Sequence, residues 1–527
     1  MASLRVVIVK PSKYSADGFV ERFRRGFMPN STLPYLASMT PRVVGGRPCN
    51  VETIDEYVET DAGYLERFES RAGERTLVAL VGVQSHQLHR ALDLAACARS
   101  RGAQAVIGGP HPMTCDTSML QGRGVAFALS EAETIWPAIL EDAVSGELAP
   151  VYGGGQRWER QLDPPVLVPP TRRSLARYAV PMLGIYPARG CPYSCNFCSV
   201  IKIAGHRVRS QPVETTLASL RAAKAAGVRF VMFTSDNFNK YGDVRELLDA
   251  MVSERIGLPF FAQCDAQIHR QEDLVELMAR AGCHQIFVGT ESFDTEALRG
   301  AHKFHNDPSR YAKIVALCRE NGITSHFSNI LGFPPDTESG ILRHLATLRD
   351  LAPDVASFYL LTPIPGTEQY DDFRRDGWIT ERNLDRYDGT CVTWKHPNLS
   401  GEDLRRLLFR SYREFYRARD VAGKLLRLLR GRRDYRKSSA LFAVFGLSAM
   451  SRLAAAHRVH PMAGGVARVR RDGARDYASL RRRVFGFDLA PLPASLALSA
   501  ADEALNSVAV RRASATNAAA APDRGES

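Results

Sequence analysis

The sequence predicts an α/β protein with two parallel sheets in succession, followed by a mainly α-helical region. Short apolar runs alternate with helical stretches twice along the chain, first up to residue 145 and again from 182 to about 370. Between the two series lies a connector rich in Pro, Gly and Arg, which is typical of a linker between domains. At 527 residues the chain has room for about three domains.

The first series predicts a doubly wound parallel sheet over residues 1–145. Leu4–Lys10 is a continuous apolar strand that ends at Pro11. Helices are expected at Gln87–Ser100 and Glu133–Ala143. Further strands are expected at Asn50–Ile54, Thr76–Val83, Ala105–Ile107 and Val125–Leu129. Ligands of such a sheet bind at the carboxyl ends of its strands.

The second series predicts a partial (β/α)6 barrel over residues 181–370, after a linker at 146–180. Its strands are expected at 182–187, 229–234, 258–263, 284–289, 324–330 and 356–361. Active-site residues of a barrel gather at the carboxyl ends of its strands. A C-terminal helical cap is expected at 371–490, and the Ala- and Ser-rich residues 491–527 are expected to be disordered.

Composition places the chain among ordinary soluble globular proteins, with 45% hydrophobic and 24% charged residues. Its ten cysteines are spread singly apart from one loop, so they do not form the pattern of a disulfide framework. No signal-peptide core follows Met1–Arg5. We therefore expect a reducing cytoplasm.

The net charge of +12 is unevenly distributed. Residues 401–527 carry 25 Lys and Arg against 12 Asp and Glu, whereas the remainder carries 44 against 45. The positive excess therefore lies in the C-terminal region and not around the candidate site, which argues against a nucleic-acid partner. In that region the basic run Gly431–Lys437 precedes the apolar run Leu441–Met450. This pattern predicts either a segment that lies on an anionic membrane surface or a basic helical cap packed on the barrel.

One loop concentrates three thiols within eight residues: Cys191, Cys195 and Cys198, spaced C-x3-C-x2-C just after the first barrel strand. Structural zinc needs four ligands, whereas three thiolates on one loop suit an iron–sulfur cluster with one iron left open. An incomplete zinc knuckle and three unrelated core cysteines are the alternatives. The placement between a strand and a helix favours the cluster.

The cysteine spacing, with the aromatic Phe197 before the third cysteine, resembles the signature of the radical S-adenosylmethionine (SAM) family. That resemblance implies a 4Fe-4S cluster held by Cys191, Cys195 and Cys198, with SAM on the open iron. The contacts to SAM that it implies are Phe197, Asp236, Gln263, Gly289, Glu291, Ser292 and Gly332. An Asp/Asn turn capping the next helix would explain Asp236 equally well, and a structural turn would explain Gly332 nearly as well.

The first domain resembles the cobalamin-binding domain of cobalamin-dependent (class B) radical SAM methyltransferases, through the loop Gly108-Gly109-Pro110 after a strand. The contacts to cobalamin that this implies are Pro11, Ser85, Gly108, Gly109, Pro110, Ser130 and Glu131. Two features depart from known patterns. Ser130-Glu131-Ala132-Glu133 replaces the family's Gly-Glu-Gly-Glu, and the D-x-H-x-x-G motif of other cobalamin carriers is absent, so no lower axial histidine is expected.

The resemblance implies an enzyme that makes a 5′-deoxyadenosyl radical and, with cobalamin, methylates an unactivated carbon of a small molecule such as a lipid or natural product. It also implies an external electron donor such as flavodoxin or ferredoxin. An oxidative cyclase or rearrangement enzyme without methyl transfer is the alternative. An RNA methylthiotransferase is disfavoured because residues 1–150 hold no second cysteine set, and an intact barrel disfavours a non-enzymatic sensor of cobalamin or iron.

Overall fold

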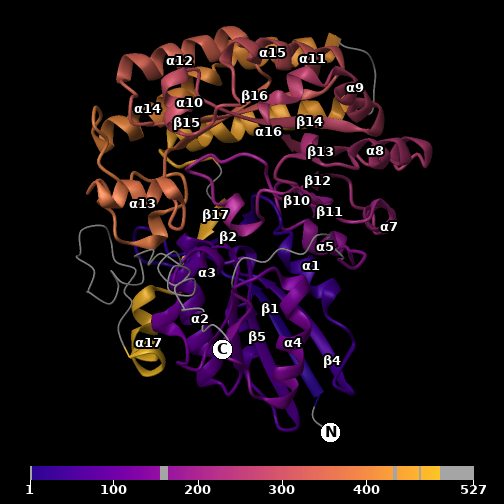
Figure 1. Cartoon of the computed structure of the whole chain (residues 1–527), viewed down its shortest axis with the longest axis vertical. Helices are drawn as coiled ribbons and strands as arrows, with labels where there is room; N and C mark the ends of the chain where they lie inside the picture. Colours follow the sequence, from indigo (N-terminus) through magenta and orange to yellow (C-terminus); the bar gives the residue numbers. More distant parts are fainter. Residues whose placement is uncertain (1–2, 155–163, 431–435, 462–463, 487–527) are drawn as a thin grey trace, which may run out of the picture.

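The structure, a computed structural model, describes residues 3–154, 164–430, 436–461 and 464–486. Two parallel sheets form its two halves, and Figure 1 shows the N-terminal sheet below the second one. The predicted α/β class is confirmed, with the doubly wound sheet first and the partial barrel second.

The N-terminal sheet has seven strands in the order β3-β4-β1-β5-β6-β7-β8, and its neighbours are parallel apart from β3 and β4. The strands are β1 (Ser3–Lys10), β3 (Val43–Val44), β4 (Arg47–Asp55), β5 (Glu74–Leu80), β6 (Gln104–Gly108), β7 (Ala126–Ala128) and β8 (Val151–Tyr152). Because β4 and β5 lie on opposite sides of β1, the winding direction reverses there. Such a reversal leaves a ligand crevice at the carboxyl ends of the strands.

Helices cover both faces of this sheet, which explains why Val6–Val9 of β1 are all fully buried. Leu4, Val6 and Ile8 pack with α1 (Thr32–Met39) and α4 (Ala132–Ser145). Val7 and Val9 pack with α2 (Leu88–Ser100) on the other face. A short helix, α3 (Pro110–Thr114), follows β6.

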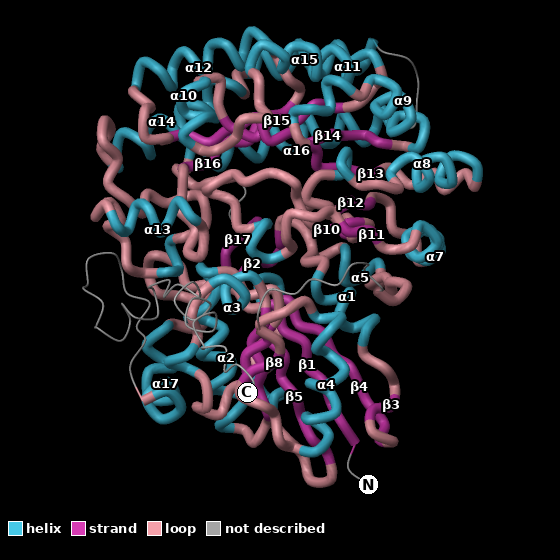
Figure 2. The backbone as a smooth tube through the Cα atoms, in the orientation of Figure 1, coloured by secondary structure: helices cyan, strands magenta, loops and turns pink. Residues whose placement is uncertain are grey.

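The second sheet has six parallel strands in the order β9-β12-β13-β14-β15-β16. They are β9 (Leu183–Ile185), β12 (Val231–Phe233), β13 (Phe260–Cys264), β14 (Cys283–Glu291), β15 (Thr324–Leu331) and β16 (Val355–Leu360). The helices between them are α7 (Val213–Ala225), α8 (Val244–Ser253), α9 (Glu272–Ala281), α10 (Thr295–Gly300), α11 (Tyr311–Glu320) and α12 (Glu338–Leu351). Figure 2 shows α11 and α12 along one side of β14 and β15. Within the described residues β9 and β16 are the two edges, so the barrel stays open.

The C-terminal region covers the open barrel and then returns to the N-terminal half. Its helices are α13 (Glu368–Arg375), α14 (Gly401–Phe415), α15 (Ala418–Arg430), α16 (Arg436–Ala456) and α17 (Ala478–Phe485), and the connector contains α5 (Arg172–Leu175). Helix α16 lies against β14 and β16, with Val444 and Ala455 fully buried. This placement agrees with the predicted cap, although Phe445 and Leu453 on the outer side are exposed. Residues 431–435 of the basic run lie outside the described residues.

No helix within the described residues is both long and apolar enough to cross a lipid bilayer.

Several short strands were not predicted from the sequence. Within the C-terminal region, which was expected to be mainly helical, β17 (Gly465–Val469) pairs antiparallel with β2 (Arg22–Gly26). Figure 1 shows this two-stranded ribbon between the two halves of the molecule. Neither strand has a clear apolar alternation, and the partners are far apart along the chain, so no local pattern indicates their pairing.

A buried ionic network attaches the C-terminal region to the N-terminal sheet. Arg481 of α17 donates two hydrogen bonds to Asp93 of α2, at 2.6 and 2.7 Å. Arg22 of β2 donates to Asp472 at 2.7 Å, and Arg90 of α2 donates to Glu56 at 2.6 Å. Apart from Asp472, these side chains are almost completely buried.

Replacing Arg481 by Ala should therefore destabilise the fold strongly, because the buried carboxyl group of Asp93 would lose its main cationic partner. We expect a loss of about 3–5 kcal/mol, with faster proteolysis of residues 464–486. The matched control is Arg468→Ala, since Arg468 is 35% exposed in its ion pairs and should cost less than about 1 kcal/mol. Thermal unfolding and limited proteolysis measure both variants, and equal effects would contradict the account.

Acid should weaken the same network through Glu56. Burial raises the pKa of Glu56, but Arg90 and Arg22 outweigh it and lower the pKa to about 2, from an ordinary value of 4.5. A depressed carboxyl pKa contributes stability above 4.5 that is lost as the pH falls toward 2. Between these values we expect wild type to lose roughly 3 kcal/mol more stability than Glu56→Gln. Urea denaturation at a series of pH values measures this difference, and parallel losses would refute it.

Candidate active site

The cysteine loop follows β9 and the short strand β10 (Ala188–Arg189). It leads into α6 (Val200–Ile203). Cys195 is buried, whereas Cys191 and Cys198 are half-buried and none of the three is in a disulfide. The amide of Asn237 donates to the Cys191 Sγ at 3.0 Å. Burial raises the pKa of Cys191 to about 11 and that of Cys198 to about 12. Within the described residues no three His, Cys, Asp or Glu side chains are arranged to hold a single metal ion.

Asp236 follows β12 and stabilises the start of this loop. Its Oδ2 accepts a hydrogen bond from the backbone nitrogen of Gly190 at 2.8 Å. Gly190 itself has a φ of +102°, and a Cβ there would lie 2.2 Å from the carbonyl oxygen of Arg207. The loop therefore requires glycine at this position. Asp236 also lines the cavity between the two sheets that is described below, so it stands between the two parts of the site.

At the end of β14, Glu291 lies beside Lys303, which the sequence did not suggest. Their side chains form an ion pair at 2.7 Å and are almost completely buried. Ser328 of β15 donates to the second carboxylate oxygen of Glu291 at 3.2 Å. Burial lowers the pKa of Lys303, but Glu291 and Cys195 outweigh it and raise the pKa above its usual value. Lys303 follows α10 rather than a strand end, so the rule that found Glu291 could not find it.

The backbone around Glu291 is adapted to this ion pair. Glu291 has a φ of +61°, a conformation that costs energy for a residue other than Gly, Asn or Asp. A Cβ on Gly289 would lie 2.6 Å from the carboxylate of Glu291 and 3.0 Å from Lys303 Nζ. Ser292 accepts a hydrogen bond from the backbone of Asp294 at 3.0 Å, just before α10. The Gly-x-Glu-Ser segment thus places one carboxylate and one ammonium group together at the rim of the barrel.

Phe197 connects the cysteine loop with this rim. The Lys303 ammonium lies 5.7 Å from the centre of the Phe197 ring. On its other side the ring packs edge-on against Phe333, with centroids 6.4 Å apart. The predicted site residues Phe197, Gly289 and Glu291 therefore gather around Lys303, close to Cys195.

Two other residues predicted to contact SAM, Gly332 and Gln263, lie apart from the residues around Lys303. Gly332 has a φ of +88°, its backbone nitrogen donates to Asp336 at 2.8 Å, and a Cβ there would lie 2.9 Å from Leu404 of α14. These contacts are those of a structural turn. Gln263 of β13 lines a second cavity on the inner face of the barrel.

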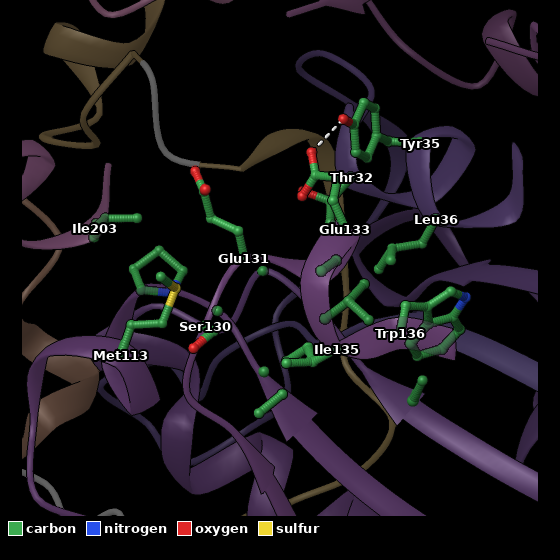
Figure 3. A pocket seen from close by; sticks show the side chains of 18 of the residues that line it. Thr32, Tyr35, Leu36, Met113, Ser130, Glu131, Glu133, Ile135, Trp136 and Ile203 are labelled. Atoms are coloured by element: carbon green, nitrogen blue, oxygen red, sulfur yellow. Dashed lines mark hydrogen bonds between the residues drawn. The ribbon is translucent and has the colours of Figure 1, made fainter. Parts of the chain in front are cut away.

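A cavity of about 270 Å³ joins the N-terminal sheet to the barrel. One wall is formed at strand ends of the N-terminal sheet by Gly108, Gly109, Pro110 and Ser130. Facing residues of the barrel half include Tyr186, Arg189, Ile203 and Asp236. Its floor is apolar and lies between the sheet and α4. Figure 3 shows this arrangement, with Ile135 and Trp136 on the right, Met113 and Ser130 on the left, and Ile203 above Met113.

Acidic residues of the N-terminal half bind arginines of the barrel half at the edge of this cavity. Glu131 accepts hydrogen bonds from both terminal nitrogens of Arg209, each at 2.7 Å. Glu133 pairs with Arg189 at 2.8 Å and accepts a hydrogen bond from Tyr35. The Ser-Glu-Ala-Glu segment therefore fixes the two sheets relative to each other, a role that its sequence did not reveal.

The two remaining predicted cobalamin contacts lie at the same edge of the sheet but do not line the cavity. The carbonyl oxygen of Pro11 accepts a hydrogen bond from Gln87 at 2.8 Å. Ser85 Oγ lies 3.0 Å from Nδ1 of the buried His111. Both residues therefore support the loops around the cavity.

Known proteins resemble the chain over both halves. A curated relative, the bacteriochlorophyllide d C-12(1)-methyltransferase of Chlorobaculum tepidum, is 25% identical over 337 residues, which are 62% of this chain and 72% of the relative. The hopanoid C-3 methylase of Methylococcus capsulatus is 24% identical over 424 residues, covering 74% of this chain and 79% of the relative.

A solved structure shares the fold. It is the radical S-adenosylmethionine methyltransferase TsrM from Kitasatospora setae with cobalamin and a [4Fe-4S] cluster bound. The match has a TM-score of 0.61 at 15% identity and covers 86% of this chain and all of TsrM. The model of the radical SAM superfamily matches residues 185–348, a range that contains the cysteine loop, Glu291 and Lys303. Residues 185–348 are therefore a radical SAM domain.

Proposed function

We propose that this chain is a cobalamin-dependent radical SAM methyltransferase that methylates an unactivated carbon of a small molecule. Residues 1–145 together with β8 would form the cobalamin-binding domain, the rest of 146–180 the linker, 181–370 the radical SAM barrel and 371–490 the cap. The names of the relatives support methylation as the reaction, because both are carbon methylases or methyltransferases of small molecules.

The observation that carries this proposal is the cavity between the two sheets. It lies at the strand ends where a doubly wound fold binds its ligands, and its opposite wall belongs to the radical SAM domain. Gly108 and Gly109 bear no side chain, and Gly109 has a φ of +138° that brings the loop against Val83. The apolar floor and the bare backbone suit a large, flat, mostly uncharged group, so the residues fit cobalamin.

The residues of the chain have separable roles in this reaction. When bound, the cluster with SAM supplies a 5′-deoxyadenosyl radical and cobalamin supplies a methyl group. Cys191, Cys195 and Cys198 would hold the cluster. Glu291, which is ion-paired with Lys303, would accept hydrogen bonds from SAM. The apolar walls of the cavity would exclude water from the reaction.

We also propose an electron donor, a cellular compartment and a membrane contact for this enzyme. Reduction of the cluster would need an external donor such as flavodoxin or ferredoxin in a reducing cytoplasm. The exposed Phe445 and Leu453 on α16, together with the basic C-terminal region, support peripheral contact with an anionic membrane.

A matched pair of variants tests the cofactor assignment. Ala132 lines the cavity at the start of α4, whereas Ala138 of the same helix is exposed. Ala132→Trp should reduce the affinity for hydroxocobalamin at least tenfold, and Ala138→Trp should leave it unchanged. Cobalamin retained after gel filtration is measured by its visible absorbance. No retention by wild type, or equal retention by both variants, would overturn the assignment.

A further inference from the structure

A second cavity, of about 310 Å³, lies on the inner face of the open barrel and takes no part in the site described so far. Its walls come from the inner side of the sheet, from α16, and from Phe27–Met28 and Ala179–Val180, which precede the barrel. This volume lies within the range of small-molecule pockets. Gly446, Leu447 and Met450 of α16 contribute one wall.

The lining of this second cavity is apolar and carries no formal charge. Phe230, Phe261 and Phe287 line it together with Met182 and Met232. Of the described residues around it, none is Asp, Glu, Lys or Arg. Its two histidines are neutral near pH 7, because burial lowers the pKa of His284 to about 4 and that of His326 to about 3. Such a lining favours an uncharged hydrocarbon over a charged or highly polar ligand.

A few polar groups in the wall can recognise one polar end of a ligand. Gln285 and His326 are hydrogen-bonded at 2.7 Å, and His326 is in turn bonded to Ser357 at 2.7 Å. His284 is 5% exposed, and its Nδ1 has no hydrogen-bond partner among the described residues. A buried ring nitrogen without a partner suits a hydroxyl or carbonyl group of a ligand.

The cavity reaches toward the SAM-binding rim along the inner face of the sheet. Gln263 and Tyr359 belong to its lining. Burial raises the pKa of Tyr359 to about 12, and the negative charge of Glu291 adds to this rise, so Tyr359 lies within electrostatic reach of Glu291. A molecule held here would therefore extend toward the radical SAM site.

We infer that this cavity binds the hydrocarbon body of an uncharged, lipid-like substrate that carries a single hydroxyl or carbonyl end. The link to catalysis rests on the proposed function, whereas the binding itself does not. Helix α16 contributes one wall of this site through Gly446, Leu447 and Met450.

Gly446 offers a direct test. It lines the cavity, and a Cβ built on it has no atom within 4 Å, so a larger side chain has room there. Gly446→Phe should fill part of the cavity, and Ala449→Phe places the same ring on the exposed side of the same helix. With radiolabelled farnesol as the probe, we expect wild type and Ala449→Phe to bind equally and Gly446→Phe to bind at least tenfold more weakly. Farnesoic acid, the charged counterpart, should bind wild type more weakly than farnesol at pH 7.

Two further measurements make the outcome decisive. Thermal unfolding shows whether Gly446→Phe is folded, and replacing a glycine within a helix should not weaken α16. If that variant is nevertheless unfolded, Met450→Gln, which places an amide in the same wall, should weaken farnesol binding instead. Formation of 5′-deoxyadenosine by reconstituted wild type tests the proposed function separately. Wild-type enzyme that forms 5′-deoxyadenosine but does not bind farnesol would overturn this inference and leave the proposed function intact. Equal farnesol binding by Gly446→Phe and Ala449→Phe would also overturn it.

Discussion

Replacing any one of Cys191, Cys195 and Cys198 by Ala should abolish the cluster and all radical chemistry. Three thiolates are the whole protein contribution to a site-differentiated 4Fe-4S cluster, and the structure places all three on one loop after β9. We expect the visible absorbance of the anaerobically reconstituted protein to collapse. Formation of 5′-deoxyadenosine from SAM should fall to the background of the assay.

The control is Cys49→Ala, since Cys49 is a buried residue of β4 in the other sheet. It should retain the iron content and the 5′-deoxyadenosine yield of wild type. A cluster that persists in the Cys198→Ala variant would contradict the assignment of this loop.

Replacing Glu291 by Gln should weaken SAM binding at least tenfold while the cluster remains. A charge-assisted hydrogen bond contributes about 1.5–3 kcal/mol, and tenfold corresponds to about 1.4 kcal/mol. Gln keeps the shape of the side chain, so the strained backbone at φ +61° is perturbed little. Lys303 would lose its partner at 2.7 Å, and a small loss of thermal stability should accompany the weaker binding.

The matched control is Glu296→Gln in the first turn of α10, where the carboxylate is exposed. Equilibrium dialysis with SAM compares the two variants after reconstitution. Unchanged affinity in Glu291→Gln would show that the Glu291–Lys303 pair has a structural role only.

Local pattern predicted both sheets because each strand is a short apolar run that packs in the core. The six barrel strands expected from 182 to 361 correspond to β9 and β12–β16. Pattern failed for β2 and β17, which are short, lack a clear apolar alternation and pair across more than 400 residues of the chain. It also failed for the ion pair between Arg481 and Asp93, since neither residue differs from a surface charge in sequence.

In the candidate site, too, the sequence indicates some residues and not others. Residues at strand ends, such as Glu291 and Asp236, were found because topology brings strand ends together. Lys303 was missed because it follows a helix, and Glu131 could not be recognised as a partner of Arg209 on the other sheet. The second cavity was invisible because α16 forms one of its walls, and the sequence left two alternatives for that segment.

Methyl transfer is tested most directly by following the methyl group of SAM. Cells that produce the wild-type chain or its Cys198→Ala variant are fed methionine with a trideuterated methyl group, and their lipid extracts are compared by mass spectrometry. The account predicts a product that carries one intact trideuteromethyl group in the wild-type cells alone, together with 5′-deoxyadenosine formation by the purified enzyme. A product that depends on Cys198 but gains no deuterium would contradict methyl transfer and support the oxidative alternative.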